Sequence, residues 1–198
     1  ESRSQFDKLA PSFTGKSVSV LIWTTTPWTI PSNLAVAFHP ELTYGVYDSK
    51  TEPGDSSALI LAKDLASRVE HETGHVLGEP LATCQGRDLE SLRFQHPLYE
   101  RDSLAVLADY VTIEQGTGAV HTAPGHGTDD FNTGTRYGLE VYAPVGPDGK
   151  FAANVELFAG LRVFDSNPKV EEALIARKRL WHRSNLDHSY PHCWRCHN

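Results

Sequence analysis

The chain has 198 residues, of which 39% are hydrophobic and 22% are charged, which is typical of a globular protein long enough to bury a core. Its formal charge of −7 at pH 7 argues against broad, sequence-blind binding to nucleic-acid phosphates. Because no apolar run approaches the roughly 20 residues of a membrane-spanning helix, we expect no membrane partner. The three cysteines form no disulfide framework, so we expect a reducing, cytoplasmic location. The absence of methionine indicates a piece of a longer protein.

Short apolar segments, the first of them dense in β-branched residues, predict strands in the first half of the chain. They lie between turn residues and cover residues 17–26, 34–38, 43–47 and 58–62. Pro27 and Pro31 prevent the first of these from continuing as a central strand. Residues 48–57 are rich in Asp, Ser, Gly and Pro and predict a loop, and residues 64–70 predict a short helix.

The second half of the chain predicts further strands at residues 98–99 and 105–113. A short helix is expected to begin at Asp129 or Asp130, because carboxylates favour helix N-termini, and to end at Gly138. The last helix is expected to begin at Asn167, which precedes a proline. Many short strands with a few helices predict a mainly β, β-rich α+β fold, built as a closed or near-closed β-barrel with peripheral α-helices.

Three adjacent threonines, Thr24, Thr25 and Thr26, stand where the first predicted strand meets Pro27. Threonine is a good strand residue, so the run is consistent with ordinary sheet composition. However, side chains at the end of a strand can also meet a ligand. Hydroxyl groups both donate and accept hydrogen bonds, which suits a carbonyl or the oxygens of a ribose. The residues alone leave both interpretations open.

A glycine-rich segment, GTGAVHTAPGHGTDD, covers residues 116–130. It lacks the third glycine of a dinucleotide-binding loop and the Gly-Lys-Ser/Thr of a P-loop, which argues against both. His121, His126 and the two aspartates could hold a metal ion, or the histidines could be surface residues beside a helix cap. Asp130 could equally form a charge-assisted bond with a substrate ammonium group.

The sequence argues against a covalent nucleophile but contains half of a possible zinc site. There is no Gly-x-Ser-x-Gly, and Cys84 has no obvious base nearby, so we expect no covalent nucleophile. A hydrolase of this sequence would have to position a water molecule. Cys193 and Cys196 have the spacing of half a zinc site, and nearby histidines could complete it: His188, His192 or His197.

Two of these segments together resemble the editing domain of isoleucyl-tRNA synthetase, an insertion in the catalytic domain of a class I enzyme. They are WTTTPWTIPSN (23–33) and GTGAVHTAPGHGTDDF (116–131), and AVAFHPELTY, LADYV and SYPHCWRC extend the likeness over most of the chain. The valine and leucine enzymes typically have an arginine before the proline of the first motif, where this chain has Thr26 before Pro27. His121 stands where the valine enzyme usually has a lysine. Thr128 departs from a position often held by proline.

The resemblance implies hydrolysis of the valyl ester on misacylated tRNA(Ile), and of valyl-adenylate, by a fragment of an ATP-binding isoleucine–tRNA ligase. The implied partners are the acceptor end of that tRNA and the catalytic domain of the same parent chain, and the isolated domain is expected to be monomeric. Residues 1–16 would be a linker, 17–186 the editing domain and 187–198 the connection to the parent. Editing would need no cofactor. Cys193 and Cys196 would be half of a structural zinc site that the full-length parent or nearby histidines could complete.

The resemblance also implies the role of each site residue. Three hydroxyls would line the pocket and bind the aminoacyl carbonyl and the terminal adenosine, from Thr24, Thr25 and Thr26. His121 would close the pocket for the amino-acid side chain and reject isoleucine sterically. Asp130 would hold the α-ammonium group, Trp23 would form a wall, and Asn33 is expected to be structural.

Two alternatives use the same residues differently. The chain could be a metal-dependent hydrolase that uses His121, His126 and Asp130. It could also be a module that binds the acceptor end of tRNA without catalysing any reaction.

Overall fold

The computed structural model describes residues 2–11, 14–15, 17–48 and 57–185, and these form two four-stranded mixed sheets. The first sheet has the order β1-β4-β3-β5, with the strands Val18–Val20, Ala58–Ala62, Thr43–Asp48 and Ala82–Gln85. The second has the order β6-β7-β2-β8, with the strands Arg93–Gln95, Asp102–Leu107, Ala35–Phe38 and Ala119–Thr122. Strand β2 runs parallel to β7 and antiparallel to β8.

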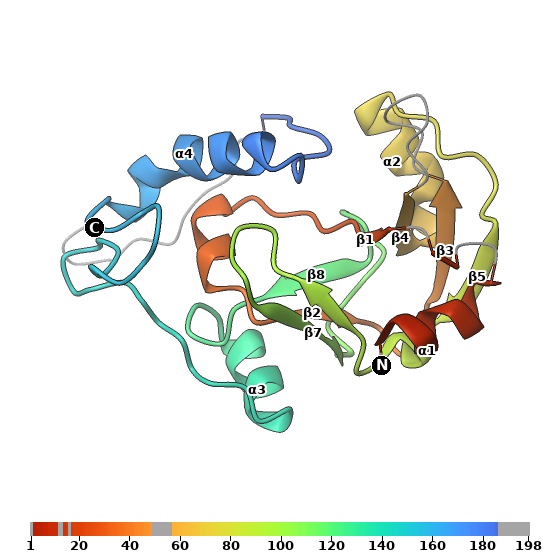
Figure 1. Cartoon of the computed structure of the whole chain (residues 1–198), viewed down its shortest axis with the longest axis horizontal. Coiled ribbons are helices and arrows are strands. Elements are labelled where there is room, and N and C mark those ends of the chain that lie inside the picture. Colours follow the sequence, from red (N-terminus) through yellow and green to blue (C-terminus); the bar gives the residue numbers. More distant parts are fainter. Residues whose placement is uncertain (1, 12–13, 16, 49–56, 186–198) are drawn as a thin grey trace.

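Helices surround the two sheets (Figure 1). The α-helices are α1 (Ser2–Leu9), α2 (Ala66–Thr73), α3 (Thr128–Arg136) and α4 (Val163–Ala176). Short 3-10 helices are η2 (Pro27–Ser32), η3 (Lys63–Leu65) and η4 (Gly86–Leu89). Helices α1 and α2 flank the first sheet, α3 lies beside the second, and α4 lies above η2 (Figure 1). Among the described residues, no helix is long and apolar enough to cross a membrane.

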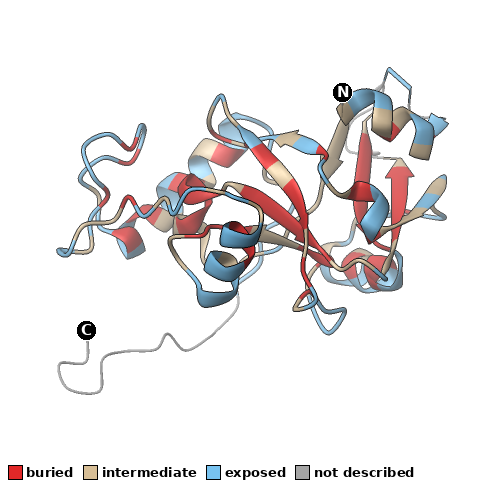
Figure 2. Cartoon of the chain, turned by 90° about the horizontal axis from the view of Figure 1, so that it is seen from below, coloured by how far each residue is buried: buried red, intermediate tan, exposed pale blue. Residues whose placement is uncertain are grey.

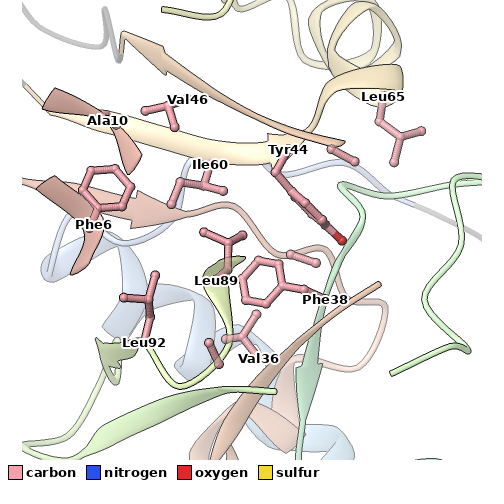
Figure 3. Packing of buried hydrophobic residues seen from close by; sticks show 14 residues of the cluster. Phe6, Ala10, Val36, Phe38, Tyr44, Val46, Ile60, Leu65, Leu89 and Leu92 are labelled. Atoms are coloured by element: carbon pink, nitrogen blue, oxygen red, sulfur yellow. The ribbon is translucent and has the colours of Figure 1, made fainter. Parts of the chain in front are cut away.

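The main core lies where the two sheets meet. Strands β2 and β4 are buried along their whole length, which explains why both read as unbroken apolar runs (Figure 2). The core brings together side chains from both sheets and from η4, among them Phe38, Tyr44, Ile60 and Leu89 (Figure 3). The rings of Phe38 and Tyr44 meet edge to face at 5.2 Å, so one aromatic pair bridges the sheets.

The β-rich α+β class agrees with the sequence prediction, but the barrel does not. The described strands form two open sheets, and the edges that a barrel would have to join belong to β1 and β5 and to β6 and β8. Strands β1 and β6 have three residues each, which is too short to close a barrel wall. The 3-10 helices that interrupt the chain after β1, β4 and β5 also turn it away before a strand can lengthen.

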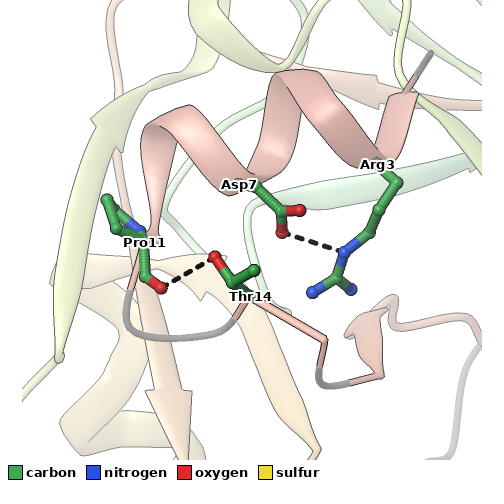
Figure 4. Close-up of polar contacts among 4 residues, drawn as sticks. All are labelled: Arg3, Asp7, Pro11 and Thr14. Atoms are coloured by element: carbon green, nitrogen blue, oxygen red, sulfur yellow. Dashed lines mark hydrogen bonds and ion pairs between the residues drawn. The ribbon is translucent and has the colours of Figure 1, made fainter.

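Residues 1–16, for which the sequence predicts a linker, include helix α1. Its Phe6 is buried in the main core, and Arg3 and Asp7 form an ion pair of 2.9 Å on its outer side (Figure 4). The Thr14 hydroxyl donates to the carbonyl of Pro11 at 2.9 Å and closes the turn after the helix (Figure 4). The described part of this segment therefore contributes to the core.

Several predicted elements are found and others are not. Strands β2, β3 and β4 and helix α3 lie where the sequence predicts them. The first strand ends at Val20 instead of reaching Pro27, and residues 98–99 form no strand. Helix α4 begins at Val163, four residues before the predicted start at Asn167. Strands β5, β6 and β8 were not predicted.

Tyr44 joins the first sheet to the loop that leads into β8. Its hydroxyl donates to the carbonyl of Gly118 at 2.6 Å and accepts from the His39 backbone N–H at 3.0 Å. Burial raises the pKa of Tyr44 to about 12, so the donor proton is retained. Gly118 has a φ of +74°, and a Cβ on it would lie 2.4 Å from the Cβ of Ala62, so this close approach requires glycine.

We predict that Tyr44→Phe lowers the free energy of unfolding by about 1–3 kcal/mol, because it leaves a buried N–H and a buried carbonyl without their partner. Urea denaturation measures the change. Tyr142→Phe is the control, because the ring of Tyr142 that contacts Arg101 is retained, and its effect should stay within about 0.5 kcal/mol. Equal effects of the two substitutions would contradict the bridging role of the Tyr44 hydroxyl.

Candidate functional site

Thr24, Thr25 and Thr26, called the threonine turn below, lie between β1 and η2 and belong to no strand. The Thr24 hydroxyl accepts from the backbone N–H of Thr26 at 3.0 Å, so this side chain closes the turn itself. The hydroxyl oxygens of Thr25 and Thr26 lie 3.4 Å apart. The carbonyl of Thr26 accepts from both the backbone N–H and the hydroxyl of Thr29, at 3.0 and 2.9 Å. The threonines therefore form a rigid turn, and ordinary strand composition does not explain them.

His121 lies on β8, where it pairs with Val36 of β2, and it is linked to the threonine turn through Thr29, which donates to the carbonyl of Thr26. Its Nε2 lies 2.9 Å from the hydroxyl oxygen of Thr29, and its Nδ1 lies 2.8 Å from the side-chain nitrogen of Asn33. Since Thr29 uses its only hydroxyl proton on the carbonyl of Thr26, it accepts from His121. The imidazole therefore carries its proton on Nε2 and accepts on Nδ1.

The orientation of the Asn33 amide supports this tautomer. The Asn33 nitrogen donates to the carbonyl of Ala35 at 2.7 Å, and a carbonyl can only accept. The Asn33 oxygen accepts from the hydroxyl of Ser103 on β7. Asn33 and Ser103 are both buried, so the polar groups that hold His121 are shielded from water. Nothing in the sequence motifs singles out Thr29 or Ser103, and Asn33 was expected only to be structural.

His121 is neutral near pH 7. Burial, and to a smaller degree the neighbouring His126, lower its pKa to about 4. With both ring nitrogens bonded, the side chain cannot rotate without breaking two hydrogen bonds. His121 is thus suited to shape a pocket wall, and less suited to proton transfer or metal binding.

Asp130 lies in the first turn of α3 and is directed back toward β8. Its Oδ2 accepts from the backbone N–H of Ala123 at 2.8 Å, two residues after His121. Burial raises the pKa of this half-buried carboxyl group, while the bond from Ala123 opposes that shift. The residue before α3 is Gly127, so the helix has no side-chain cap, and Asp130 bonds outside the helix instead of capping it. A carboxylate there is favourably placed for the helix dipole.

Trp23 connects the two sequence motifs. Its side chain is 40% exposed, and a Cβ built on Gly116 would lie 3.4 Å from it. The glycine at this position therefore lets the glycine-rich loop pack against the tryptophan. The exposed ring is consistent with a wall at the entrance of a pocket.

His126, for which the sequence leaves a metal ligand and a surface residue open, is half-buried against η2. Its Nε2 lies 2.9 Å from the hydroxyl of Ser32, and its ring meets the edge of Trp28 at 5.2 Å. Burial lowers its pKa. Among the described residues, no three His, Cys, Asp or Glu side chains are grouped so that they could hold a metal ion.

The cysteines divide between described and undescribed parts of the chain. Cys84 is half-buried, and burial raises its pKa to about 11, so its thiol is a poor nucleophile. Cys193 and Cys196 lie outside the described residues, so the predicted zinc half-site has no structural test here.

A separate hollow of about 230 Å³ lies along one side of α3. Its lining includes Asp129 and Arg136 but none of the residues predicted for the site. We place the candidate site not in the hollow but at the hydrogen-bonded group of Thr26, Thr29, Asn33 and His121, because all four residues belong to the two sequence motifs.

Comparison with known proteins identifies the family. The family model described as "Leucyl-tRNA synthetase, editing domain" matches residues 73–167. The chain is 50% identical over 179 residues to the isoleucine–tRNA ligase of Halorhodospira halophila, covering 90% of this chain and 19% of the relative. It is 45% identical over 195 residues to that of Pseudoalteromonas atlantica, covering 96% of this chain and 20% of the relative. The chain thus spans about a fifth of the length of these relatives.

Solved structures show the same fold. The crystal structure of GlLeuRS-CP1 has a TM-score of 0.70 at 18% identity, covering 93% of this chain and 91% of the other. The editing domain of the P. knowlesi cytosolic leucyl-tRNA synthetase has a TM-score of 0.66 at 12% identity, covering 89% of this chain and 91% of the other. The family model and the sequence relatives place the chain in the family of aminoacyl-tRNA synthetase editing domains, of the isoleucine type, and the solved structures agree in fold.

Proposed function

We propose that this chain hydrolyses the ester between valine and the terminal ribose of tRNA(Ile), as the editing domain of an isoleucine–tRNA ligase. The observation that carries the proposal is the neutral His121 ring, which Asn33 and Thr29 hold beside the threonine turn. A ring fixed in this way can stop a side chain that is one methylene too long. Asp130, which is bonded two residues further along the same segment, supplies the negative charge for an α-ammonium group.

The physical need for such a site follows from the sizes of the amino acids. One methylene group is worth only about 1–3 kcal/mol in an apolar pocket, and the isoleucine–valine pair is the standard instance of this limit. A second site that admits valine and excludes the larger isoleucine reverses the order of preference between the two amino acids. A rigid wall does this better than a mobile one, because a mobile side chain would move aside for isoleucine.

The residues around the threonine turn favour attack by a positioned water. The Thr25 and Thr26 hydroxyls can bind the ester carbonyl and a ribose hydroxyl, while Asp130 fixes the amino group. The Nδ1 lone pair of His121 is already bonded to Asn33, so His121 is not proposed as the base. Orientation and stabilisation of the developing oxyanion would then supply most of the rate.

The proposal extends to the parent protein. We infer that the partners are the acceptor end of tRNA(Ile) carrying valine and the catalytic domain of the same chain, that valyl-adenylate is a second substrate, and that the site works in the cytoplasm. No cofactor is needed for the hydrolysis. A zinc ion at Cys193 and Cys196 would be structural and would belong to the parent.

We predict that Asp130→Asn lowers kcat/KM for valyl-tRNA(Ile) deacylation by about 10-fold to 100-fold, because the charge-assisted bond to the substrate is lost. The asparagine oxygen can still accept from Ala123, so the fold is preserved. Asp129→Asn is the matched control, because Asp129 is exposed and lines the separate hollow. Unchanged activity in Asp130→Asn would reject the ammonium role.

We predict that His121→Ala makes isoleucyl-tRNA(Ile) a substrate, with its deacylation rate rising about tenfold or more as the steric wall is removed. Deacylation of valyl and isoleucyl esters is followed in parallel. His126→Ala is the control, because its ring bonds Ser32 and packs on Trp28, whereas the ring of His121 bonds Thr29 and Asn33. If His121→Ala keeps the wild-type preference for the valyl ester, the steric role is wrong.

We predict that chelation with EDTA leaves valyl-tRNA(Ile) deacylation unchanged. A metal-dependent hydrolase using His121, His126 and Asp130 would lose activity on chelation and regain it with zinc. A module that only binds would retain aminoacyl-tRNA without releasing valine. Either result would replace the proposed function.

A further inference from the structure

Helix η2 follows the threonine turn directly, and its first turn lacks the usual capping bond. Thr26 occupies the N-cap position, Pro27 follows it, and Trp28 is the next residue. The side chain of an N-cap threonine normally accepts from the backbone N–H two or three residues on. The Thr26 side chain makes no such bond, although its hydroxyl could reach this position in a standard cap.

A residue far away in the sequence supplies the missing hydrogen-bond acceptor. The side-chain oxygen of Asn167 on α4 accepts from the backbone N–H of Trp28 at 3.0 Å, across 139 residues. Because α4 begins at Val163, Asn167 is not the cap of its own helix, and its amide is available to η2. Figure 1 shows the orange segment that contains η2 beneath α4, and the two helices are in contact.

Apolar packing holds Asn167 at this position. Ile30 of η2 shares a buried cluster with Val170 and Leu174 of α4. The rings of Trp28 and Phe164 meet at 6.4 Å, on the same side of the contact. This packing fixes the distance between the two helices. At that distance the backbone N–H of Trp28 can donate to the side-chain oxygen of Asn167.

We propose that Asn167 is a positioning residue, which caps η2 from outside and thereby leaves the Thr26 hydroxyl to the site. A single N–H cannot make two good hydrogen bonds, so the asparagine oxygen and the Thr26 hydroxyl compete for Trp28. With Asn167 in place, the Thr26 hydroxyl lies 3.4 Å from that of Thr25. Without Asn167, the hydroxyl turns to the Trp28 N–H as an ordinary N-cap. The consequence for catalysis rests on the proposed function, whereas the capping itself does not.

Amide hydrogen exchange of Trp28 in the full-length protein tests the capping. Thr26→Val alone leaves the protection of this amide unchanged, because Asn167 still accepts from it. Asn167→Ala alone lowers protection by less than about twofold, since Thr26 takes over the cap. The double variant lowers it by about fivefold or more, the ratio that a typical capping bond sustains. Additive effects of the two single substitutions overturn the proposal.

Deacylation of valyl-tRNA(Ile) tests the consequence. Asn167→Ala lowers kcat by about fivefold or more with a smaller change in KM, and adding Thr26→Val to it costs less than Thr26→Val costs in the wild type. Asn167→Asp keeps an acceptor oxygen and retains wild-type kcat. Lys169→Ala, on the exposed side of the same helix, also leaves kcat unchanged.

The two measurements separate the possible failures. If the exchange cycle is additive, the capping role of Asn167 is wrong, whatever the deacylation assay gives. If Thr26→Val costs as much in the Asn167→Ala background as in the wild type, the link from cap to site is wrong. A wild-type protein that hydrolyses no aminoacyl ester overturns the proposed function, and the exchange cycle still decides whether Asn167 caps η2.

Discussion

The imidazole of His121 joins two separate parts of the chain, because β8 carries the ring and its two nitrogens bond the segment formed by η2 and the residue after it. Asn33, just before β2, binds one nitrogen, and Thr29 of η2 binds the other. The ring itself is placed by the antiparallel pairing of β8 with β2, which sets His121 opposite Val36. Shifting this register by one residue would turn the imidazole to the other face of the sheet and break both bonds. The two sequence motifs therefore form one site only because this pairing is correct.

The neutrality of His121 matters for a substrate that carries an ammonium group. A protonated imidazole at this position would repel the cation that Asp130 is proposed to bind. Burial keeps the pKa of His121 at about 4, so this repulsion is absent at neutral pH. For Asp130 the same burial raises the pKa, and a bound ammonium group would offset that cost by pairing with the carboxylate. Burial at the two residues thus keeps a positive charge off His121 and makes the carboxylate of Asp130 favour a cationic ligand.

The fold could be predicted where the information is local. Residues 58–62 are all apolar and form a strand in the interior of a sheet, and Asp129 and Asp130 mark the start of α3. The closed barrel was predicted from the number of short strands, but closure depends on which edges pair, and the pattern of a single strand does not contain that information. Strand β8 escaped prediction because it is four residues long and lies within a glycine-rich segment.

The candidate site shows the same limit. Thr24, His121 and Asp130 were found through motifs, whereas Thr29, Ser103 and Asn167 matter only through contacts that the fold creates. A serine on β7 carries no signal in the sequence. Its importance appears only when the buried amide of Asn33 is seen to need a donor for its oxygen.

The three adjacent threonines are identical in sequence but not in their bonds. The Thr24 hydroxyl accepts from the backbone of Thr26 and so closes the turn, which makes it structural. The backbone N–H of Thr26 donates to Thr24, and its carbonyl accepts from Thr29. Its hydroxyl is therefore the polar group of this residue that can change its hydrogen-bond partner. Removing the hydroxyl group from Thr24 would therefore disturb the shape of the turn, whereas the same change in Thr26 would alter the chemistry it presents. Conservative substitutions at these two positions are not equivalent, because the backbone bonds that surround each hydroxyl decide what it can do.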